Sequence, residues 1–521
     1  MKNRTFLKGA LILIIFNLIG KVIGAVYRIP LARIIGSVGM GEYQLIFPLY
    51  SLFLTISTSG IPVAISKLVA EYSSQNRFKE IKKLLKISFI VLFIITFLGA
   101  SILVLGARFF AKLHGNELTY ITYYAIAPAV IFVGMLSAFR GYFQGKLKMV
   151  PTAVSGLIEQ VLKLVIGLFL AIKLSNFGVI YSVFGALLGI SISEFFALLF
   201  LIICYIFDRL KSKKVIVYRD YESLSTTKVA KQFLHLVVPI TLGGLIVPIT
   251  TMVNSFITIS SLMSVGYTNE ISAMMLGLES GVVEPLIHMP VVIAISLSTV
   301  LLPSLSGLQA NGKTEKVKQL ICKTYQITLS LAVAAAVCYV IFGEQIISLL
   351  YGSSFTDAEV YLSVKILFLS SANIIFLSLV QITTSVLQGL GHTKYPVVVL
   401  IVASILKVAL NAMLIRMPEL NIMGTVIASV LCQLFIVLLN QHKVKKITGA
   451  SPKNAIFYIS IQAVMVCLFA FFSNRFLKII LNSSLSLVVA GAISLLIFCV
   501  SYYMFFIYKK KVTILSNNSV E

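Results

Sequence analysis

The chain has 521 residues, of which 59% are hydrophobic, and its mean hydropathy is +1.00. A soluble protein of this length would be about half apolar, so this composition excludes a water-soluble protein and predicts a polytopic membrane protein. The formal net charge of +25 would suggest nucleic-acid binding in a soluble chain, but the positions of the basic residues, described below, exclude that partner.

The first apolar run begins near residue 6 and is long enough to cross a bilayer, which takes about 20 residues. It carries Lys21, Arg28 and Arg33, although each cation near the bilayer centre costs roughly 2.5–3.5 kcal/mol on insertion scales. Lys21 and Arg28 are seven residues apart and fall on nearly one helical face. Pro30 is expected to bend the helix between Arg28 and Arg33. Lys21 and Arg33 have the alternative of snorkelling to opposite membrane surfaces, whereas Arg28 lies too far from either end, so we expect it to face a cavity.

Fourteen apolar runs follow one another along the chain, and most of their connections are short. They lie near residues 6–33, 43–70, 85–110, 119–143, 150–173, 177–206, 232–260, 279–304, 322–343, 361–388, 395–415, 421–440, 454–474 and 484–508. The sequence therefore predicts an all-α polytopic membrane protein with about 14 transmembrane helices. The longest connection, 208–231, leaves no room for a soluble domain.

The basic residues are distributed unevenly over the loops. If the N-terminus lies in the cytoplasm and the loops alternate, the inside segments hold 31 Lys and Arg, the outside segments hold six, and six more lie within spans. Cytoplasmic loops of membrane proteins carry an excess of Lys and Arg, so this split predicts that both termini are cytoplasmic. We expect the basic loops to face the anionic inner leaflet of the membrane rather than nucleic acid.

An internal repeat relates two parts of the chain. The segment FQGKLKMVPTAVSGLIEQVLKLVIGLFL resembles LQGLGHTKYPVVVLIVASILKVALNAML, so that Gln144 and Gln388 are 244 residues apart, as are Lys163 and Lys407. A weaker echo pairs GIPVAISKLVAEY with HMPVVIAISLSTV. Parallel repeats of this kind place a substrate site between the two halves, near the membrane midplane.

The repeat predicts a division of the chain into two parallel six-helix lobes followed by two further C-terminal helices. We expect an N-terminal lobe at 1–210, a basic cytoplasmic linker at 211–231, a C-terminal lobe at 232–446, and an extra helix pair with a cytoplasmic tail at 447–521.

Two other patterns are interpreted as structural. Gly307 to Thr314 reads GLQANGKT and matches the phosphate-binding P-loop pattern, but it follows a membrane span and lacks the strand and nucleotide-binding domain that a P-loop requires, so we expect a cytoplasmic turn. The six cysteines form no C-x-x-C pair, and we expect no disulfide framework, no metal site and no cofactor.

Polar residues inside the spans are the candidates for function. Glu159 and Lys163 are four residues apart and either neutralise each other or line a cavity. Lys407 and Asn411 share a face of the eleventh span.

Glu284 and His288 are also four residues apart, in the eighth span. They either relay protons, with a role in coupling or gating, or simply remain hydrated at the outer end of the span.

The charges of the first six spans favour an anionic substrate. Cations outnumber acids there: Lys21, Arg28, Arg33 and Lys163 stand against Glu159 and Glu194. A phosphate or pyrophosphate group suits such a cavity, whereas a pump for cationic drugs would need the opposite balance.

Several phrases of the sequence resemble the MurJ-type lipid II flippases and their SpoVB and YtgP relatives, within the multidrug/oligosaccharidyl-lipid/polysaccharide exporter superfamily. These phrases are GKVIGAVYRIPLARIIG, SGIPVAISKLVAEY, RGYFQGKLKMVPTAVSGLIEQ and MPVVIAISLSTVLLPSLS. The resemblance implies two six-span lobes around a central cavity, a groove at the last two spans for an isoprenoid tail, and rocking between inward- and outward-open states.

The resemblance carries over to individual residues only in part. Of the family's cavity cations in the first span, one falls on Lys21 and one on Tyr27, and Arg28 stands where these flippases often have an acid. Cations expected in the second and eighth spans fall near Thr55 and Pro285. Some members bind sodium through acids in the C-terminal lobe, but the seventh, eleventh and twelfth spans here contain no Asp or Glu.

We therefore expect a membrane flippase, not an enzyme, that moves undecaprenyl-pyrophosphate-linked peptidoglycan precursor (lipid II) to the outer leaflet for cell-wall or spore-cortex synthesis. The candidate substrate-binding residues are Lys21, Arg28, Arg33, Glu159, Lys163 and Lys407. Flipping of another undecaprenyl-linked glycan, such as a teichoic acid or capsule unit, is an alternative, as is a drug/cation antiporter on the same fold. The expected partners are the lipid-linked glycan, membrane lipids and cell-wall synthases, with the protein itself a monomer.

Overall fold

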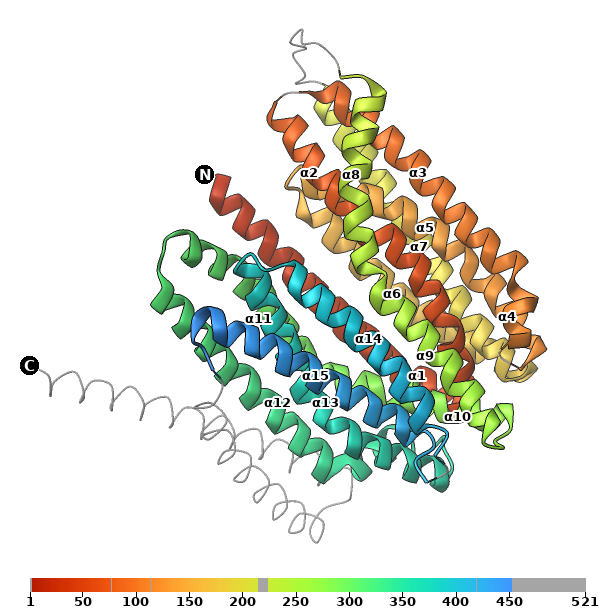
Figure 1. The fold of residues 1–521 in the computed structure, drawn as a ribbon. Helices are drawn as coiled ribbons and strands as arrows, with labels where there is room; N and C mark the ends of the chain where they lie inside the picture. The colour runs from red at the N-terminus through yellow and green to blue at the C-terminus, as the bar shows by residue number, and fades with distance from the viewer. Residues whose placement is uncertain (1, 76, 114, 214–223, 418, 452–521) are drawn as a thin grey trace, which may run out of the picture. The chain divides into compact units, whose positions relative to one another are not determined.

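The computed structural model describes residues 2–75, 77–113, 115–213, 224–417 and 419–451. Every regular element in these residues is a helix, which confirms the all-α prediction (Figure 1). Ten helical stretches of the described chain are long and apolar enough to cross a membrane. The predicted spans at 454–474 and 484–508 lie outside the described residues, so the total of fourteen and the cytoplasmic placement of both termini stay predictions.

The chain forms two compact units, which are described one at a time. Unit 1 comprises Met1–Val282 and Val408–Gly424, and unit 2 comprises the described parts of Val283–Lys407 and Thr425–Glu521. These units are defined by packing rather than by the repeat, and the predicted division at 210, 231 and 446 stays a prediction.

Unit 1 contains the first thirteen elements and the end of α14. They are α1 (Lys2–Thr58), α2 (Ile61–Ser74), α3 (Phe78–Leu105), α4 (Ala107–Leu113), η1 (Glu117–Thr119), α5 (Tyr120–Gly145), α6 (Met149–Leu174), η2 (Ser175–Phe177), α7 (Val179–Lys213), α8 (Thr226–Gly244), α9 (Ile246–Ser264), α10 (Asn269–Leu276) and the π-helical η3 (Gly277–Val283).

The described part of unit 2 is built from five helices. They are α11 (Glu284–Ala310), α12 (Thr314–Tyr351), α13 (Asp357–Gly389), α14 (Lys394–Leu414) and α15 (Met423–Thr448). The GLQANGKT segment is the end of α11, a short turn and the first residue of α12. It follows a helix rather than a strand, as expected for a turn.

The first helix changes direction at a glycine. α1 is two helices joined at Gly36, whose φ of 70° and ψ of −179° lie outside the helical range. Pro30 lies within the helical turns before this point, so the break falls six residues later than the bend expected from the sequence. The physical reason is that proline removes one hydrogen bond but keeps a helical φ, whereas a positive φ is readily available to glycine.

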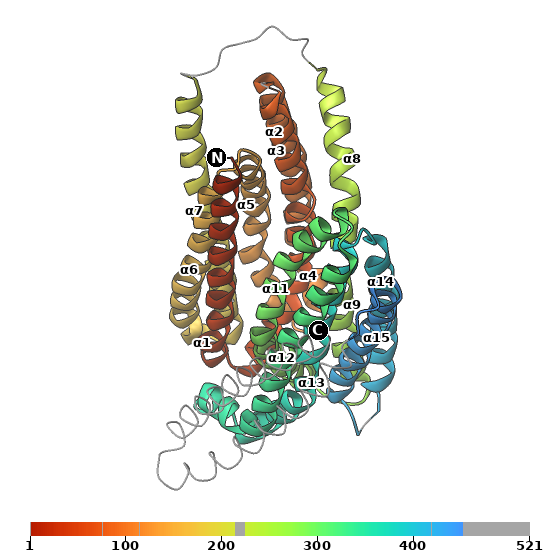
Figure 2. The ribbon, with the colours of Figure 1, turned by 90° about the vertical axis from the view of Figure 1, so that its left-hand side faces the viewer.

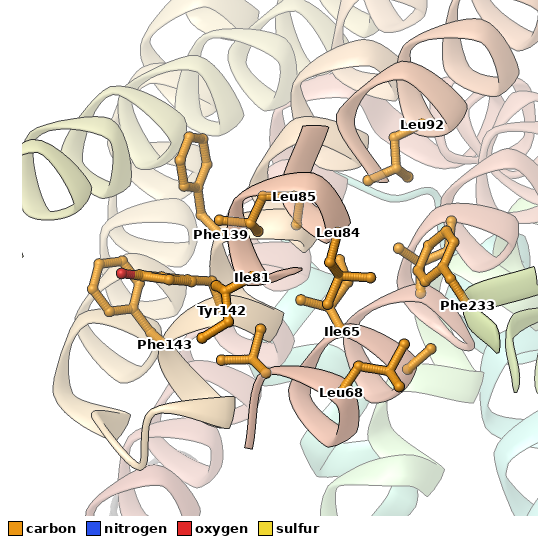
Figure 3. Packing of buried hydrophobic residues seen from close by; sticks show 14 of the residues in the cluster. Ile65, Leu68, Ile81, Leu84, Leu85, Leu92, Phe139, Tyr142, Phe143 and Phe233 are labelled. Carbon is orange, nitrogen blue, oxygen red and sulfur yellow. The ribbon is translucent and has the colours of Figure 1, made fainter. Parts of the chain in front are cut away.

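A cluster of buried apolar side chains joins α2, α3, α5, α7 and α8 (Figure 3). Ile81, Leu84 and Leu85 follow the i, i+3, i+4 spacing of one helical face, and Ile65 and Phe139 belong to the same cluster. Lipid tails are as apolar as these side chains, so close packing rather than removal from water is what such contacts add between membrane helices.

Both copies of the repeat end a helix in the same way. Gly145 ends α5, and a Cβ there would lie 2.7 Å from the carbonyl oxygen of Ser66 in α2. Gly389 ends α13, and a Cβ there would lie 3.1 Å from the carbonyl oxygen of Leu302 in α11. Glycine at these two positions therefore allows a close approach of two helix backbones within each unit.

An ionic cluster joins the end of α7 to the turn between α5 and α6. The Asp208 carboxylate accepts hydrogen bonds from Lys146 Nζ and the Tyr142 hydroxyl, each at 2.7 Å, and from Lys148 Nζ. Its side chain is 5% exposed. The same turn holds Leu147 at a φ of 57°, which is uncommon for a residue other than glycine. The cluster therefore supports a turn that the local sequence alone disfavours.

Asp208→Asn is expected to lower the free energy of unfolding by about 3 kcal/mol, because it leaves Lys146 without its buried counter-charge. Thermal unfolding of the purified full-length protein in detergent would measure the loss. Lys148→Gln is the matched control, since the Lys148 side chain is 53% exposed and its pair should contribute less than about 1 kcal/mol. Equal unfolding temperatures for wild type and Asp208→Asn would show that the cluster does not stabilise the fold.

Candidate functional site

Four helices of unit 1 carry its candidate charged residues. α6 packs against α1 and α7, and α5 packs against α7 as well as α1 (Figures 1 and 2). The approach of α1 to α6 is close because glycines face the partner helix. A Cβ at Gly24 would lie 2.9 Å from Gln160 Oε1, and one at Gly167 would lie 3.0 Å from the Tyr27 hydroxyl oxygen. Small residues at such contacts let membrane helices pack backbone to backbone.

Arg28 is partly buried on α1, and its side chain points toward the π-helical segment η3. Arg28 Nη1 donates to the carbonyl oxygen of Ser280 at 3.4 Å, and Gln44 Nε2 donates to the same oxygen. The guanidinium also lies 5.7 Å from the centre of the Phe47 ring. π-Helical turns often mark functional sites. The two halves of α1, before and after Gly36, are thus tied to one carbonyl.

Lys163 lies one turn beyond Glu159 on α6 and faces α1. Its Nζ lies 5.3 Å from the centre of the Tyr27 ring, a distance at which a cation interacts with an aromatic face. Glu159, Glu194 and Arg28 all lie within its electrostatic reach. The structure thus brings together three of the residues predicted from the sequence, Arg28, Glu159 and Lys163.

The ion-pair partner of Glu159 is Arg140, which is not among the candidate residues predicted from the sequence. Arg140 Nη2 lies 3.0 Å from Glu159 Oε2, and Arg140 Nε donates to Ser155 Oγ at 3.2 Å. Glu159 Oε1 accepts from Gln160 Nε2 at 2.8 Å. One signal was present, because Arg140 lies inside the apolar run 119–143, yet its partner is nineteen residues away and could not be read from local spacing.

Lys21 and Arg33 are exposed in the structure, on either side of Arg28. This fits the snorkelling alternative at least as well as a place in a cavity, and their role in substrate binding stays a prediction. Asn411 is fully buried in unit 1, where its Nδ2 donates to Thr258 Oγ1 at 3.2 Å and to Asn254 Oδ1 at 3.4 Å.

Unit 2 holds the other candidates. His288 Nε2 lies 3.6 Å from Glu284 Oε1 near the start of α11, and both side chains are half exposed. The two residues therefore lie close together, as their four-residue spacing allows, while a role in coupling or gating stays a prediction. Lys407 is partly buried on α14.

The described arrangement defines a multi-pass, all-helical membrane protein with cations from three helices inside one bundle. Arg28, Arg140 and Lys163 stand on α1, α5 and α6, beside the acids Glu159 and Glu194. Guanidinium and ammonium groups of this kind bind phosphate and carboxylate groups.

Comparison with known proteins identifies the family. The model of the polysaccharide biosynthesis protein family matches residues 6–309, and the MatE family model matches residues 247–413. The chain belongs to the polysaccharide biosynthesis protein family. It is 28% identical to the stage V sporulation protein B of Bacillus subtilis, over 90% of this chain and 89% of that protein. It is also 28% identical to the lipid II flippase MurJ of Bacillus subtilis, over 86% of this chain and 84% of that protein.

Solved structures show the same fold. The lipid II flippase MurJ in an inward closed conformation superposes with a TM-score of 0.71 at 16% identity, over 96% of this chain and all of that one. An inward-facing multidrug resistance MATE family transporter of the MOP superfamily gives a TM-score of 0.67 at 14% identity, over 83% of this chain and 96% of that one. The protein is a multi-pass membrane protein of the bacterial cytoplasmic membrane, and the proteins it resembles include a lipid II flippase and a multidrug resistance transporter.

Proposed function

We propose that this protein flips undecaprenyl-pyrophosphate-linked peptidoglycan precursor, lipid II, from the inner to the outer leaflet. The observation that carries the proposal is the group of cations within the bundle of unit 1. Arg28 and Lys163 are held against the Phe47 and Tyr27 rings rather than placed at helix ends. A buried cation is costly in a membrane, so its retention in a bundle points to an anionic ligand or a fixed counter-ion.

The charge of the cluster suits a pyrophosphate. Three cations, Arg28, Arg140 and Lys163, face two acids, Glu159 and Glu194, and the arginines offer donor pairs that match phosphate oxygens. In this proposal the head group is bound by unit 1, the isoprenoid tail stays in the lipid, and the protein alternates between inward- and outward-open states without covalent chemistry. The similarity to flippases named for lipid II supports the choice of substrate.

Complementation tests the proposal. The chain is expressed in a bacterium depleted of its own lipid II flippase, and growth is followed together with lipid II exposed on the outer leaflet. We expect growth to be rescued and exposure to be restored. Failure of both, with the protein shown to be in the membrane, would overturn lipid II as the substrate and favour another undecaprenyl-linked glycan, because teichoic acid and capsule units present the same pyrophosphate.

A further inference from the structure

Glu194 is a buried acid on α7 to which the proposed function gives no role. The residue is 4% exposed, and its Oε2 has no hydrogen-bond donor among the described residues. Its carboxyl group lies against that of Glu159, within hydrogen-bonding reach. A carboxylate oxygen buried without a donor is costly, whereas a protonated carboxyl can itself donate to the neighbouring acid.

The groups around this acid come from every helix that packs against α7. α5 contributes Arg140, α6 contributes Glu159 and Lys163, and α1 contributes Tyr50. The short η2 element contributes no charged residue. Arg28 stands further along α1, within electrostatic reach of Lys163.

The two acids differ in their hydrogen-bond partners. Glu159 is already paired, because Oε2 accepts from Arg140 and Oε1 accepts from Gln160. Glu194 Oε2 has no donor among the described residues, and the hydrogen-bonding neighbour of the Glu194 carboxyl is Glu159. Two carboxylates in contact repel each other, and a single proton between them replaces the repulsion by a hydrogen bond.

The same cations are within reach of a ligand. The Arg140 and Glu159 side chains are 22% and 19% exposed, so the ion pair is partly accessible to solvent and to a ligand. An anion that binds Arg140 and Lys163 competes with the two acids for the same positive charges. Once the acids lose that neutralisation, protonation of the pair becomes more favourable than it is without the anion.

We propose that Glu159 and Glu194 form a proton-binding site that shares Arg140 and Lys163 with the anionic head group, so that proton and anion bind cooperatively. The inference rests on the proposed function for the identity of the anion, and on the carboxyl contact alone for the proton. The proton comes from solvent, and the pair binds it more tightly while the anion is bound. The affinity for the anion then rises as the pH falls.

The proton site is tested without any ligand. Infrared difference spectra of the full-length protein in lipid nanodiscs detect the carbonyl stretch of a protonated carboxyl group. We expect a band in the wild type near neutral pH that is absent from both Glu194→Gln and Glu159→Gln, because the remaining acid is then neutralised by Arg140. Glu270→Gln, at an exposed acid of α10, should leave the band unchanged. A band that persists in both variants, or no band in the wild type, would overturn the proposal.

The cooperativity is tested with inorganic pyrophosphate as the probe. Its affinity for the wild type should rise as pH falls from 8 to 6 by up to about tenfold per pH unit beyond the rise seen for Glu194→Gln, since that is the limit for one linked proton. The ionisation of pyrophosphate itself is the same for both proteins and cancels. Equal pH dependence in the two proteins would refute the cooperativity. A protein that shows the carboxyl band but binds no pyrophosphate would count against the proposed function and leave the proton site standing.

Discussion

Arg28→Glu is expected to abolish flipping, with no growth of cells that rely on this protein at normal expression. The substitution replaces a cation of the cluster by an anion beside Lys163 and Phe47. Loss of one charge-assisted contact costs about 1.5–3 kcal/mol, and the reversed charge adds repulsion, so pyrophosphate binding should weaken by about 100-fold or more. Growth and outer-leaflet lipid II are the measurements.

A structural effect of this change has to be separated from the loss of charge, because Arg28 also donates to the Ser280 carbonyl. Arg28→Gln keeps a donor without the charge, and Arg28→Lys keeps the charge. If the charge matters, Arg28→Gln fails and Arg28→Lys retains part of the activity, with all three variants present in the membrane at wild-type levels. Normal growth of Arg28→Glu would show that the cation is not needed for substrate binding.

Gly41→Ala is expected to prevent stable folding of unit 1. Gly41 lies where α1 meets α10, and a Cβ there would overlap the carbonyl oxygen of Ala273. Gly277 also approaches this position, since a Cβ on Gly277 would overlap the Gly41 backbone. Both neighbours are main chain and cannot rotate away, so we expect a loss of about 4 kcal/mol or more in the free energy of unfolding.

The membrane level of Gly41→Ala and its thermal unfolding in detergent are the measurements. Gly243→Ala is the matched control, because Gly243 also lies in a helix of unit 1 but has no atom within 4 Å of an added Cβ. Alanine there should be neutral or stabilise by up to about 1 kcal/mol. An unfolding temperature of Gly41→Ala equal to that of the wild type would mean that α1 and α10 are further apart than described.

The positions of most helices could be predicted because hydropathy is a local property of the chain. The run expected at 150–173 is α6 (Met149–Leu174), and the one at 395–415 is α14 (Lys394–Leu414). The predicted boundary between the first two runs, 6–33 and 43–70, was less accurate. The chain stays helical on both sides of Gly36, and α1 ends only at Thr58. A backbone break at one glycine changes no hydropathy average.

The candidate site was predictable where one residue is anomalous by itself. Arg28 in mid-span, and Glu159 with Lys163 four residues later, stand out in any apolar run, and the structure places all three in the bundle of unit 1. Partners were not predictable in this way. The spacing suggested Glu159 with Lys163, whereas Glu159 forms its ion pair with Arg140 on another helix.

The sequence by itself determined the class of this protein. The apolar runs, the uneven distribution of Lys and Arg over the loops and the cations within spans can all be recognised from the order of residues along the chain. The resemblance of its phrases to a flippase family agreed with the family assignment. Only the tertiary structure decided which charges meet. Arg140, Glu159 and Glu194 come from α5, α6 and α7, and their contact depends on how those helices pack. Charge pairing acts over a few ångströms in space, and distance along the chain does not reveal it.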